Sequence, residues 1–239
     1  MTTALFRDDA YLTRTAARVT GVTERGGILL DRTVFYPTGG GQPGDSGWLT
    51  LGDGQRITIA TTVKGDTPDE IIHVPASADV LPEAGSEVTA EINWDVRYRY
   101  MRMHSCLHIL SAVLPYPVTG GQVSDGKGRL DFDIPEAVLD KDEITEKLNA
   151  LIAGSHPVGS DWITDAELDA RPELVKTMSV QPPRGAGRVR LIRVGEIDLQ
   201  PCGGTHVRNT SEIGAVRVRK IEKKGRQNRR VSLEFADEA

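Results

Sequence analysis

Short apolar runs alternate with turn-forming residues along the N-terminal part of the chain, which is the pattern of an all-β domain. These runs occupy residues 25–37, 45–51, 54–63, 71–75 and 87–93. Asp53 and Gly54 separate the second run from the third, and an Asp-Gly pair between two apolar runs indicates a β-hairpin. Several short strands with no helical segment predict a small β-barrel over residues 1–93.

After Asn93 the apolar residues recur at the three- and four-residue steps of an amphipathic helix. The residues in this stripe are Tyr100, Met103, Leu107, Leu110 and Leu114. Pro115 is expected to end the helix, because proline cannot continue the helical hydrogen-bond ladder. Residues 136–154 predict a second helix. Its apolar face is expected to contain Ile144, Leu148 and Leu151.

The rest of the chain combines a strand pair, a short helical piece and three strands in which apolar and basic residues alternate. The strand pair is expected at 123–134, the helical piece at 165–177, and the strands at 187–194, 214–221 and 229–235. Helices placed irregularly among strands are typical of the α+β class. The sequence therefore predicts an α+β domain over residues 94–239 after the barrel.

The composition is that of a soluble globular protein, with 38% hydrophobic and 26% charged residues. No apolar run approaches the roughly 18 residues that a membrane-spanning helix needs. The N-terminus lacks the basic-then-apolar order of a signal peptide, so we expect a cytoplasmic protein with no membrane partner. Its two cysteines, Cys106 and Cys202, cannot make a disulfide framework. Cys106 is expected to be a small core residue.

Two pairs of potential metal ligands lie far apart in the sequence, each with a spacing of four residues. His104 and His108 belong to the first predicted helix, where this spacing places both side chains on one face. Cys202 and His206 flank two glycines, which let the backbone bend around an ion. Three imidazoles and one thiolate suit zinc. Four protein ligands also describe a purely structural site. A net charge of about +1 would still attract a carbonyl, an amino group or water to a fifth position.

A glycine-rich stretch, FYPTGGGQPGDSG, covers residues 35–47. Consecutive glycines allow backbone amides to approach a ligand closely. The stretch is not a phosphate-binding P-loop, because no Gly-Lys-Ser/Thr follows. A wide hairpin loop is the alternative interpretation. Gln42 is the side chain in the stretch that can both donate and accept hydrogen bonds.

Four blocks together resemble the editing domain of alanyl-tRNA synthetase and its free-standing relatives, the AlaX trans-editing proteins. In chain order the blocks are LLDRTVFYPTGGGQPGDSG, NWDVRYRYMRMHSCLHIL, GGQVSDGKGRLDFDI and LQPCGGTHVRNTSEIGAVRV, and they span almost the whole chain. Editing domains of threonyl-tRNA synthetases share the two metal motifs but are not known for the glycine-rich block. Ser211 stands where relatives often have glycine.

The resemblance implies a barrel followed by a domain like the second additional domain of threonyl- and alanyl-tRNA synthetases. It implies a zinc site made by His104, His108, Cys202 and His206, and a loop that brings Gln42 near the substrate together with Gly39, Gly40 and Gly41. The implied reaction is hydrolysis of the ester that joins serine or glycine to alanine tRNA. The chain starts directly with the barrel and leaves no room for an aminoacylation domain, which matches the medium class of these proteins.

Editing requires a pocket that accepts serine and rejects alanine. One methyl or hydroxyl group provides only about 1–3 kcal/mol of discrimination in an aminoacylation pocket. A second pocket can demand a hydroxyl partner, because unpaired buried polar groups are costly. The candidates for this partner are Thr33, Gln42 and Gln122. No glutamate adjoins either histidine as in HExxH, so no general base is evident, and the terminal hydroxyl of the tRNA is an alternative.

The net charge of −5 is unevenly distributed, because residues 184–230 contain 13 Lys and Arg against 4 Asp and Glu. A basic segment can bind a polyanion even in an acidic protein. Candidates near the tRNA acceptor stem are Arg217, Arg219, Lys220, Lys223 and Lys224. The alternative interpretation is a solvated strand face.

Two classes of function remain open from the sequence. The first is a zinc-dependent aminoacyl-tRNA deacylase, and the second is a non-catalytic tRNA-binding module with a structural zinc. The glycine-rich block favours the first, because a structural zinc would not need it.

Overall fold

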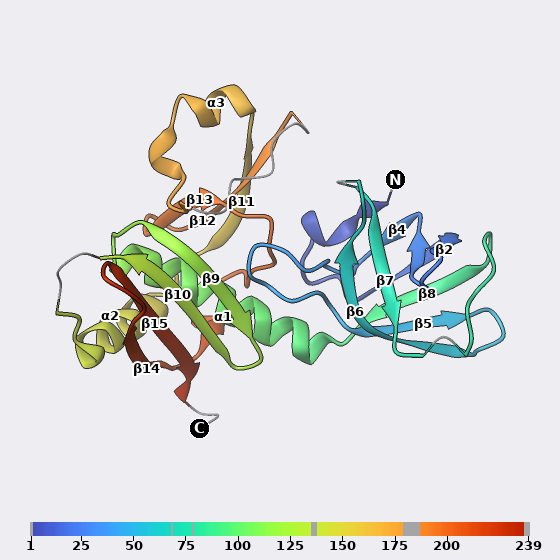
Figure 1. Ribbon diagram of the computed structural model, residues 1–239, viewed down its shortest axis with the longest axis horizontal. Helices are drawn as coiled ribbons and strands as arrows, with labels where there is room; N and C mark the ends of the chain where they lie inside the picture. Colours follow the sequence, from blue (N-terminus) through green and yellow to red (C-terminus); the bar gives the residue numbers. More distant parts are fainter. Residues whose placement is uncertain (1, 68, 78, 135–137, 179–186, 237–239) are drawn as a thin grey trace. The chain divides into compact units, whose positions relative to one another are not determined.

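The computed structural model describes residues 2–67, 69–77, 79–134, 138–178 and 187–236 (Figure 1). The chain divides into two compact units, Met1–Tyr98 and Arg99–Ala239. The division falls within helix α1 (Trp94–Val113), which begins directly after Asn93, the predicted domain boundary. Within the described residues, no helix has the length and apolar character needed to cross a membrane.

The first unit contains the predicted β-barrel, closed by six antiparallel strands in the order β2-β3-β7-β6-β5-β8 (Figure 1). The strands are β2 (Arg14–Val22), β3 (Ile28–Leu30), β5 (Gly47–Leu51), β6 (Arg56–Lys64), β7 (Ile71–Pro75) and β8 (Glu87–Ile92). Their inward side chains form one apolar cluster that includes Leu30, Leu49 and Ile59. The predicted hairpin around Asp53 and Gly54 is confirmed as the β5–β6 pair.

A small N-terminal addition accompanies the barrel. Strand β1 (Thr3–Ala4) pairs in parallel with β4 (Arg32–Thr33), and the 3-10 helix η1 (Leu5–Arg7) connects β1 to the chain that leads into β2. Strand β2 was not among the predicted strands. Its two buried residues are Ala17 and Val19, so it lacks the buried leucine and isoleucine side chains that mark the other barrel strands.

The second unit packs α1 against a four-stranded antiparallel sheet in the order β14-β15-β10-β9. The strands are β9 (Val118–Ser124), β10 (Lys127–Asp133), β14 (Val216–Lys223) and β15 (Asn228–Phe235). A Cβ added at Gly128 would lie 2.7 Å from the Met103 sulfur, so the close approach of α1 to β10 depends on this glycine. The predicted helix and the predicted strands β10, β14 and β15 are confirmed, whereas β9 begins at Val118, five residues before the predicted strand pair at 123–134.

Helix α2 (Lys141–Ala153) covers the free edge of the four-stranded sheet. The Asn149 side chain exchanges two hydrogen bonds with the backbone of Val216, at 2.8 and 3.0 Å, and the Thr145 hydroxyl accepts from the Val218 N–H at 3.0 Å. These bonds occupy backbone groups of β14 that an edge strand would otherwise leave exposed.

The sequence prediction for α2 was wrong in two details. The helix begins at Lys141, because the Asp140 side chain caps the N–H groups of residues 142 and 143. Residues 136 and 137 of the predicted helix lie outside the described residues. Ile152 is the third buried residue of the apolar face in place of Leu151, which is only half-buried, because buried positions here follow a step of four.

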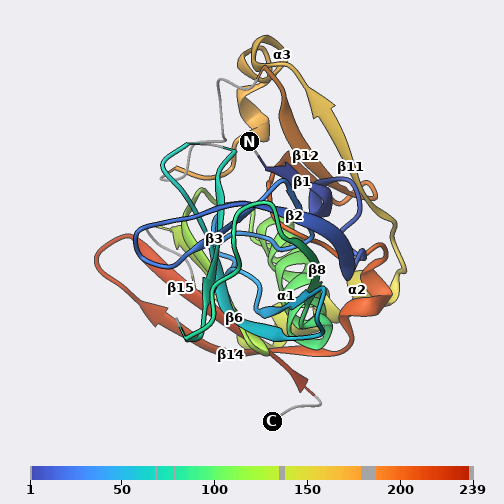
Figure 2. The ribbon, with the colours of Figure 1, turned by 90° about the vertical axis from the view of Figure 1, so that its right-hand side faces the viewer.

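A three-stranded sheet, β11-β12-β13, forms a separate layer of the second unit together with the short helices α3 and η2 (Figure 2). Its elements are β11 (Val158–Ile163), α3 (Asp165–Asp169), η2 (Pro172–Leu174), β12 (Val189–Val194) and β13 (Asp198–Pro201). Leu168, Leu174, Val189 and Leu191 form its core. Strand β11 was not predicted, because its side chains are mostly exposed and show no alternation. After β13, the 3-10 helix η3 (Thr210–Ile213) leads into β14.

A buried histidine lies inside the barrel unit. The Nδ1 atom of His73 is 3.0 Å from the Ile28 carbonyl oxygen, and its Nε2 atom is 2.7 Å from the Thr33 hydroxyl. Nδ1 must therefore carry the proton, and the Thr33 hydroxyl donates to Nε2. Burial lowers the pKa of His73 to about 4, despite the bond to Ile28, which raises it. The imidazole is thus neutral in the folded protein at neutral pH.

We predict that acid destabilises the barrel unit through His73. The unfolded chain takes up a proton near the ordinary pKa of 6.5, whereas the folded-state pKa is about 4. The unfolded state therefore binds more protons between these values, and the free energy of unfolding should fall by roughly 3 kcal/mol as the pH is lowered through this window. Chemical denaturation at several pH values between 7 and 4.5 measures this loss.

The variant His73→Asn should lose less stability over this pH range, whereas the control His156→Asn should behave like the unmodified protein. If the free energy of unfolding depended on pH equally in all three proteins, His73 would not be the source of the acid destabilisation.

Candidate metal centre

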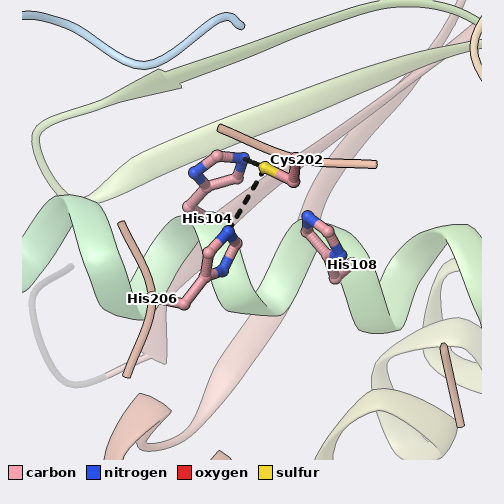
Figure 3. Close-up of side chains that lie close together, drawn as sticks. All are labelled: His104, His108, Cys202 and His206. Carbon is pink, nitrogen blue, oxygen red and sulfur yellow. Dashed lines mark hydrogen bonds between the residues drawn. The ribbon is translucent and has the colours of Figure 1, made fainter. Parts of the chain in front are cut away.

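Four potential metal ligands from two distant segments converge in the second unit (Figure 3). His104 and His108 extend from one face of α1, and Cys202 and His206 lie on the segment that follows β13. One side-chain donor atom from each residue lies within 4.8 Å of the other three. The three imidazoles are buried and Cys202 is half-buried. The two predicted pairs therefore form one cluster that can bind a metal ion.

The spacing of the donor atoms fits a single tetrahedral ion. The Cys202 Sγ atom is 3.6 Å from His104 Nε2 and 3.4 Å from His206 Nε2. Zinc–sulfur bonds of about 2.3 Å and zinc–nitrogen bonds of about 2.0–2.1 Å at tetrahedral angles place sulfur and nitrogen about 3.6 Å apart. These two sulfur–nitrogen separations therefore match those of ligands around one ion, and all four donor atoms lie within 4.8 Å of one another.

Hydrogen bonds on the opposite ring nitrogens orient two of the imidazoles. His108 Nδ1 lies 2.8 Å from Asp198 Oδ2, and His206 Nδ1 lies 3.1 Å from the Ser105 hydroxyl. Ser105 also accepts from the Val207 N–H at 3.3 Å. In both rings these contacts leave Nε2 as the atom available to an ion, which is a common arrangement for metal-binding histidines.

The segment that carries Cys202 is held by β12. The Arg190 guanidinium donates to the carbonyl oxygens of Cys202 and Gly204, at 3.2 and 2.8 Å. The Gly204 N–H lies 3.4 Å from the Cys202 sulfur, where it stabilises negative charge. The expected need for a flexible glycine is not supported at Gly203, where φ is not positive and an added Cβ would meet no atom within 4 Å.

The electrostatics of the cluster favour the protonation states that metal binding requires at Cys202 and His206, but not at His108. Burial lowers the pKa of His108, but its contacts with Asp198 and Cys202 outweigh burial and raise the pKa to about 9, so His108 must release a proton when it binds an ion. Burial raises the pKa of the Cys202 thiol, but the charges of His104 and His206 outweigh it and hold the pKa well below the usual value. Burial, with the neighbouring charge of His104, lowers the pKa of His206 well below its usual value. A thiolate and a neutral imidazole are the forms that act as ligands.

Cys106 differs from Cys202 in its burial and in the pKa of its thiol, and both differences disfavour metal binding. It is fully buried in the core of the second unit, as expected, and burial raises the pKa of its thiol to about 12. It therefore behaves as a small apolar residue.

The glycine-rich stretch is the long connection from β4 to β5, and it contains a tight turn at Gly39–Gln42. Gly39 and Gln42 exchange two backbone hydrogen bonds, at 3.1 and 3.0 Å, and the intervening Gly40 and Gly41 have φ values of 56° and 81°. Two successive positive φ values favour glycine strongly. Gln42 is buried, and Gly40 and Gly41 are exposed.

A buried ion pair closes the base of this turn. The guanidinium of Arg97 binds both carboxylate oxygens of Asp45 and donates to the Val34 carbonyl oxygen at 2.7 Å. Asp45 Oδ2 also accepts from the Tyr36 N–H at 2.6 Å. Both charged side chains are almost completely buried. The conformation of the stretch is thus fixed within the barrel unit.

The three candidate hydroxyl partners have different surroundings. Thr33 belongs to the barrel unit, where its hydroxyl donates to His73 and accepts from the Phe35 N–H at 3.0 Å. Gln42 lies in the tight turn of the same unit. Gln122 belongs to the second unit, on β9, where its exposed side chain accepts from Arg129 at 3.3 Å.

Four of the five basic candidates lie on β14, and Lys224 directly follows this strand. Arg217 and Arg219 are exposed while Val216 and Val218 are buried, as the alternating pattern predicted. The pairing register shifts between Val218 and Lys220, and Lys220 is exposed as well. The candidate side chains have acidic partners: Arg217 and Arg219 pair with Glu234, and Lys220 and Lys224 pair with Glu222. Lys223 is also exposed.

Sequence reasoning missed the polar residues that support the cluster. Asp198 and Gln200 occupy alternate positions on β13 just before Cys202, and Ser105 lies between the two histidines of α1. Lys176 comes from the chain after η2 and contacts Asp198. The only local signal for these supporting residues in the sequence was that Asp198 and Gln200, two positions apart, would lie on one side of a strand just before the ligand Cys202. The departure at Ser211 is accommodated in η3, where Asn209 accepts from its N–H.

Comparisons with known proteins identify related sequences along the whole chain. The family described as threonyl and alanyl tRNA synthetase second additional domain matches residues 189–232, and tRNA synthetases class II (A) matches residues 3–96. Alanyl-tRNA editing protein AlaX-M of Methanosarcina acetivorans is 35% identical over 245 residues, covering 99% of this chain and 100% of that protein.

Two longer relatives match over part of their length. Alanyl-tRNA editing protein AlaX-L of Pyrococcus horikoshii is 30% identical over 98% of this chain and 58% of its own length. Alanine--tRNA ligase of Metallosphaera sedula is 33% identical over 82% of this chain and 22% of its own length. The similarity therefore extends both to separate editing proteins and to a segment of a ligase.

We predict that the purified protein contains close to one transition-metal ion per chain. Replacing Cys202 by alanine removes the thiolate and leaves three imidazoles, so the Cys202→Ala variant should lose most of its metal. Elemental analysis after dialysis measures the content. The matched control is Cys106→Ala, which removes a buried thiol outside the cluster and should keep the metal. Full metal content in Cys202→Ala would refute the ligand set.

Proposed function

This chain belongs to the AlaX family of alanyl-tRNA editing proteins, and we propose that it hydrolyses the ester bond of alanine tRNA wrongly charged with serine or glycine. The observation that supports this most directly is the cluster of three imidazoles and one thiolate in a chain that matches an AlaX-M protein from end to end. The proposed enzyme is an aminoacyl-tRNA deacylase that acts in trans and depends on zinc.

Zinc is the ion that fits the donor set best, because borderline-soft Zn²⁺ favours thiolate and imidazole in a tetrahedral arrangement. We propose His104, His108, Cys202 and His206 as its ligands. When bound, zinc provides a positive charge that polarises a carbonyl or water and orients the substrate. The residues of this chain provide the fixed ligand geometry: α1 holds one pair, and Arg190 holds the loop of the other.

Gln42 is the strongest of the three candidates for recognition of the serine hydroxyl. The Thr33 hydroxyl already donates to His73 and accepts from Phe35, so it has little capacity for a further bond. The side chain of Gln122 is exposed, where bulk water competes for its hydrogen bonds. Gln42 is buried at the end of a turn that Arg97 and Asp45 hold rigidly, and the glycines Gly39, Gly40 and Gly41 shape that turn.

A non-catalytic tRNA-binding module with a structural zinc is the alternative function. Four protein ligands satisfy a structural ion, and the support of Asp198 behind His108 would serve that role as well. The tight, internally braced turn that carries Gln42 favours the enzyme, because a structural zinc does not require it.

We predict that the metal-loaded protein deacylates alanine tRNA charged with serine, and releases correctly attached alanine much more slowly. Release of labelled amino acid measures the rate, with protein treated by a chelator and then reloaded with Zn²⁺ as the control. In the same assay Gln42→Ala should lower the rate at least tenfold while tRNA affinity stays the same, because the side chain is proposed to act on the amino acid. The matched control is Gln55→Ala, an exposed glutamine in the β5–β6 turn of the same unit.

Absence of deacylation by metal-loaded protein that still binds the tRNA would favour the structural alternative. A normal rate in Gln42→Ala would remove this residue from the proposed site and leave the glycine-rich stretch as a hairpin turn.

We also propose that the basic face of β14 contacts the phosphates of the tRNA. Arg217, Arg219 and Lys220 lie exposed along one strand, and Lys223 and Lys224 continue it. The acidic partners reduce this charge only in part. Arg217 and Arg219 share the single carboxylate of Glu234, so the two arginines together with Glu234 keep a net charge of +1. Phosphates can displace such exposed partners, since surface ion pairs contribute little stability. The contacts would position the tRNA and not touch the ester.

We predict that reversing Arg217 and Arg219 to glutamate weakens tRNA binding and lowers the slope of log affinity against log salt by about two units, one for each lost phosphate contact. Metal content should not change. Lys141→Glu with Lys147→Glu on α2 makes the same change in net charge at another exposed surface, and should leave the slope nearly unaltered. If both double variants bind tRNA equally well, the β14 face is a solvated strand face.

A further inference from the structure

A buried carboxylate lies behind one of the proposed metal ligands. Asp198 Oδ2 is 2.8 Å from His108 Nδ1, and both residues are almost fully buried. Because Nδ1 faces this carboxylate, Nε2 is the nitrogen directed at the other donors. The neighbouring ligand His206 has a neutral hydroxyl, that of Ser105, in the corresponding position. The electrostatic environment of His108 therefore differs from that of His206.

Further contacts occupy the Asp198 carboxylate. Lys176 Nζ lies 2.5 Å from Oδ1, and Gln200 Nε2 donates to Oδ2 at 2.7 Å. Gln200 also donates to the Ser111 hydroxyl at 3.0 Å, and Ser111 in turn donates to the His108 carbonyl oxygen at 2.8 Å. The carboxylate is thus held from both oxygens, and it is not one of the cluster's four donors.

Lys176 is held in place by its own backbone as well as by its charge. The Lys176 carbonyl oxygen accepts from the Val118 N–H at 2.9 Å, and the Met178 N–H donates to the Val118 carbonyl oxygen at 2.8 Å. The preceding Val175 packs against the core of the three-stranded sheet. Replacing the lysine side chain therefore leaves the main features that fix this segment intact.

We infer that Asp198 is a positioning residue that fixes His108 with Nε2 toward the metal, and that Lys176 limits the negative charge which Asp198 transmits to the ion. The inference rests on the metal site of the proposed function and assigns two of its supporting residues. A carboxylate on Nδ1 increases the electron donation of a ligating imidazole. A lysine on the far oxygen of the same carboxylate opposes that effect and adds positive charge near a cation.

The two residues should therefore have opposite effects on metal affinity. Asp198→Asn keeps the size of the side chain and an oxygen that can accept from Nδ1, but it removes the charge. Lys176→Met keeps most of the length of the side chain and removes the positive charge that repels the ion. A role confined to holding the fold together would make both variants weaker, because each breaks the same buried contact.

The test measures metal affinity directly, by competition between the whole protein and a chelator of known affinity, with Zn²⁺ and with Co²⁺. Asp198→Asn should bind 10–100-fold more weakly, and the Co²⁺ absorption bands should shift because His108 is less firmly oriented. Lys176→Met should bind several-fold more tightly. Asp161→Asn and Lys147→Met, which make the same changes at exposed ion pairs of the same unit, are the matched controls and should match the unmodified protein.

Unchanged affinity and an unchanged Co²⁺ spectrum in Asp198→Asn would overturn the positioning role. Weaker binding in Lys176→Met, parallel to that of Asp198→Asn, would overturn the charge-limiting role and point to a shared effect on folding. Neither result requires tRNA, so either can occur while the unmodified protein still deacylates its substrate. Conversely, inactivity of a metal-loaded protein with the expected affinities would reject the proposed enzyme and retain this inference.

Discussion

The second unit depends on one demanding juxtaposition, the meeting of α1 with the Cys202–His206 segment in a mostly buried position. Buried polar groups are costly unless each has a partner, and here an imidazole face must meet a thiolate from a different part of the chain. The structure provides a partner for the sulfur and for the outward nitrogens of two imidazoles. The sulfur contacts two imidazoles and a backbone N–H, and Ser105 and Asp198 satisfy the outward nitrogens of His206 and His108.

The rest of the unit keeps the two segments in register. Gly128 lets α1 come close to the sheet, and Arg190 attaches the cysteine segment to β12. These interactions lie outside the donor set, yet they determine how far the donor atoms are from one another. Metal binding would then add stability to an arrangement already formed by hydrogen bonds.

Local periodicity was enough to predict α1, the alternating strands and the barrel apart from β2, because each of these elements buries one regular face. The i, i+4 spacing of His104 and His108 likewise reports a helix face directly. Strand β11 escaped prediction because almost all of its side chains are exposed. The contacts of Asp198 with His108 and Lys176 were not predicted for another reason. They join residues that are far apart in the chain, and neither periodicity nor spacing in the sequence indicates which distant residues are in contact. The family resemblance identified the donor residues but not what orients them.

Helix α1 limits how this protein can be divided into separate fragments. It runs without interruption through the division between Tyr98 and Arg99. A protease therefore meets helical backbone at the division, where a linker would otherwise invite cleavage. A gene fragment that ends there would cut consecutive helical hydrogen bonds. It would also leave Arg97, which braces the glycine-rich turn, at a fraying end. The two units can thus be distinguished by their cores but not excised as independent modules at their boundary.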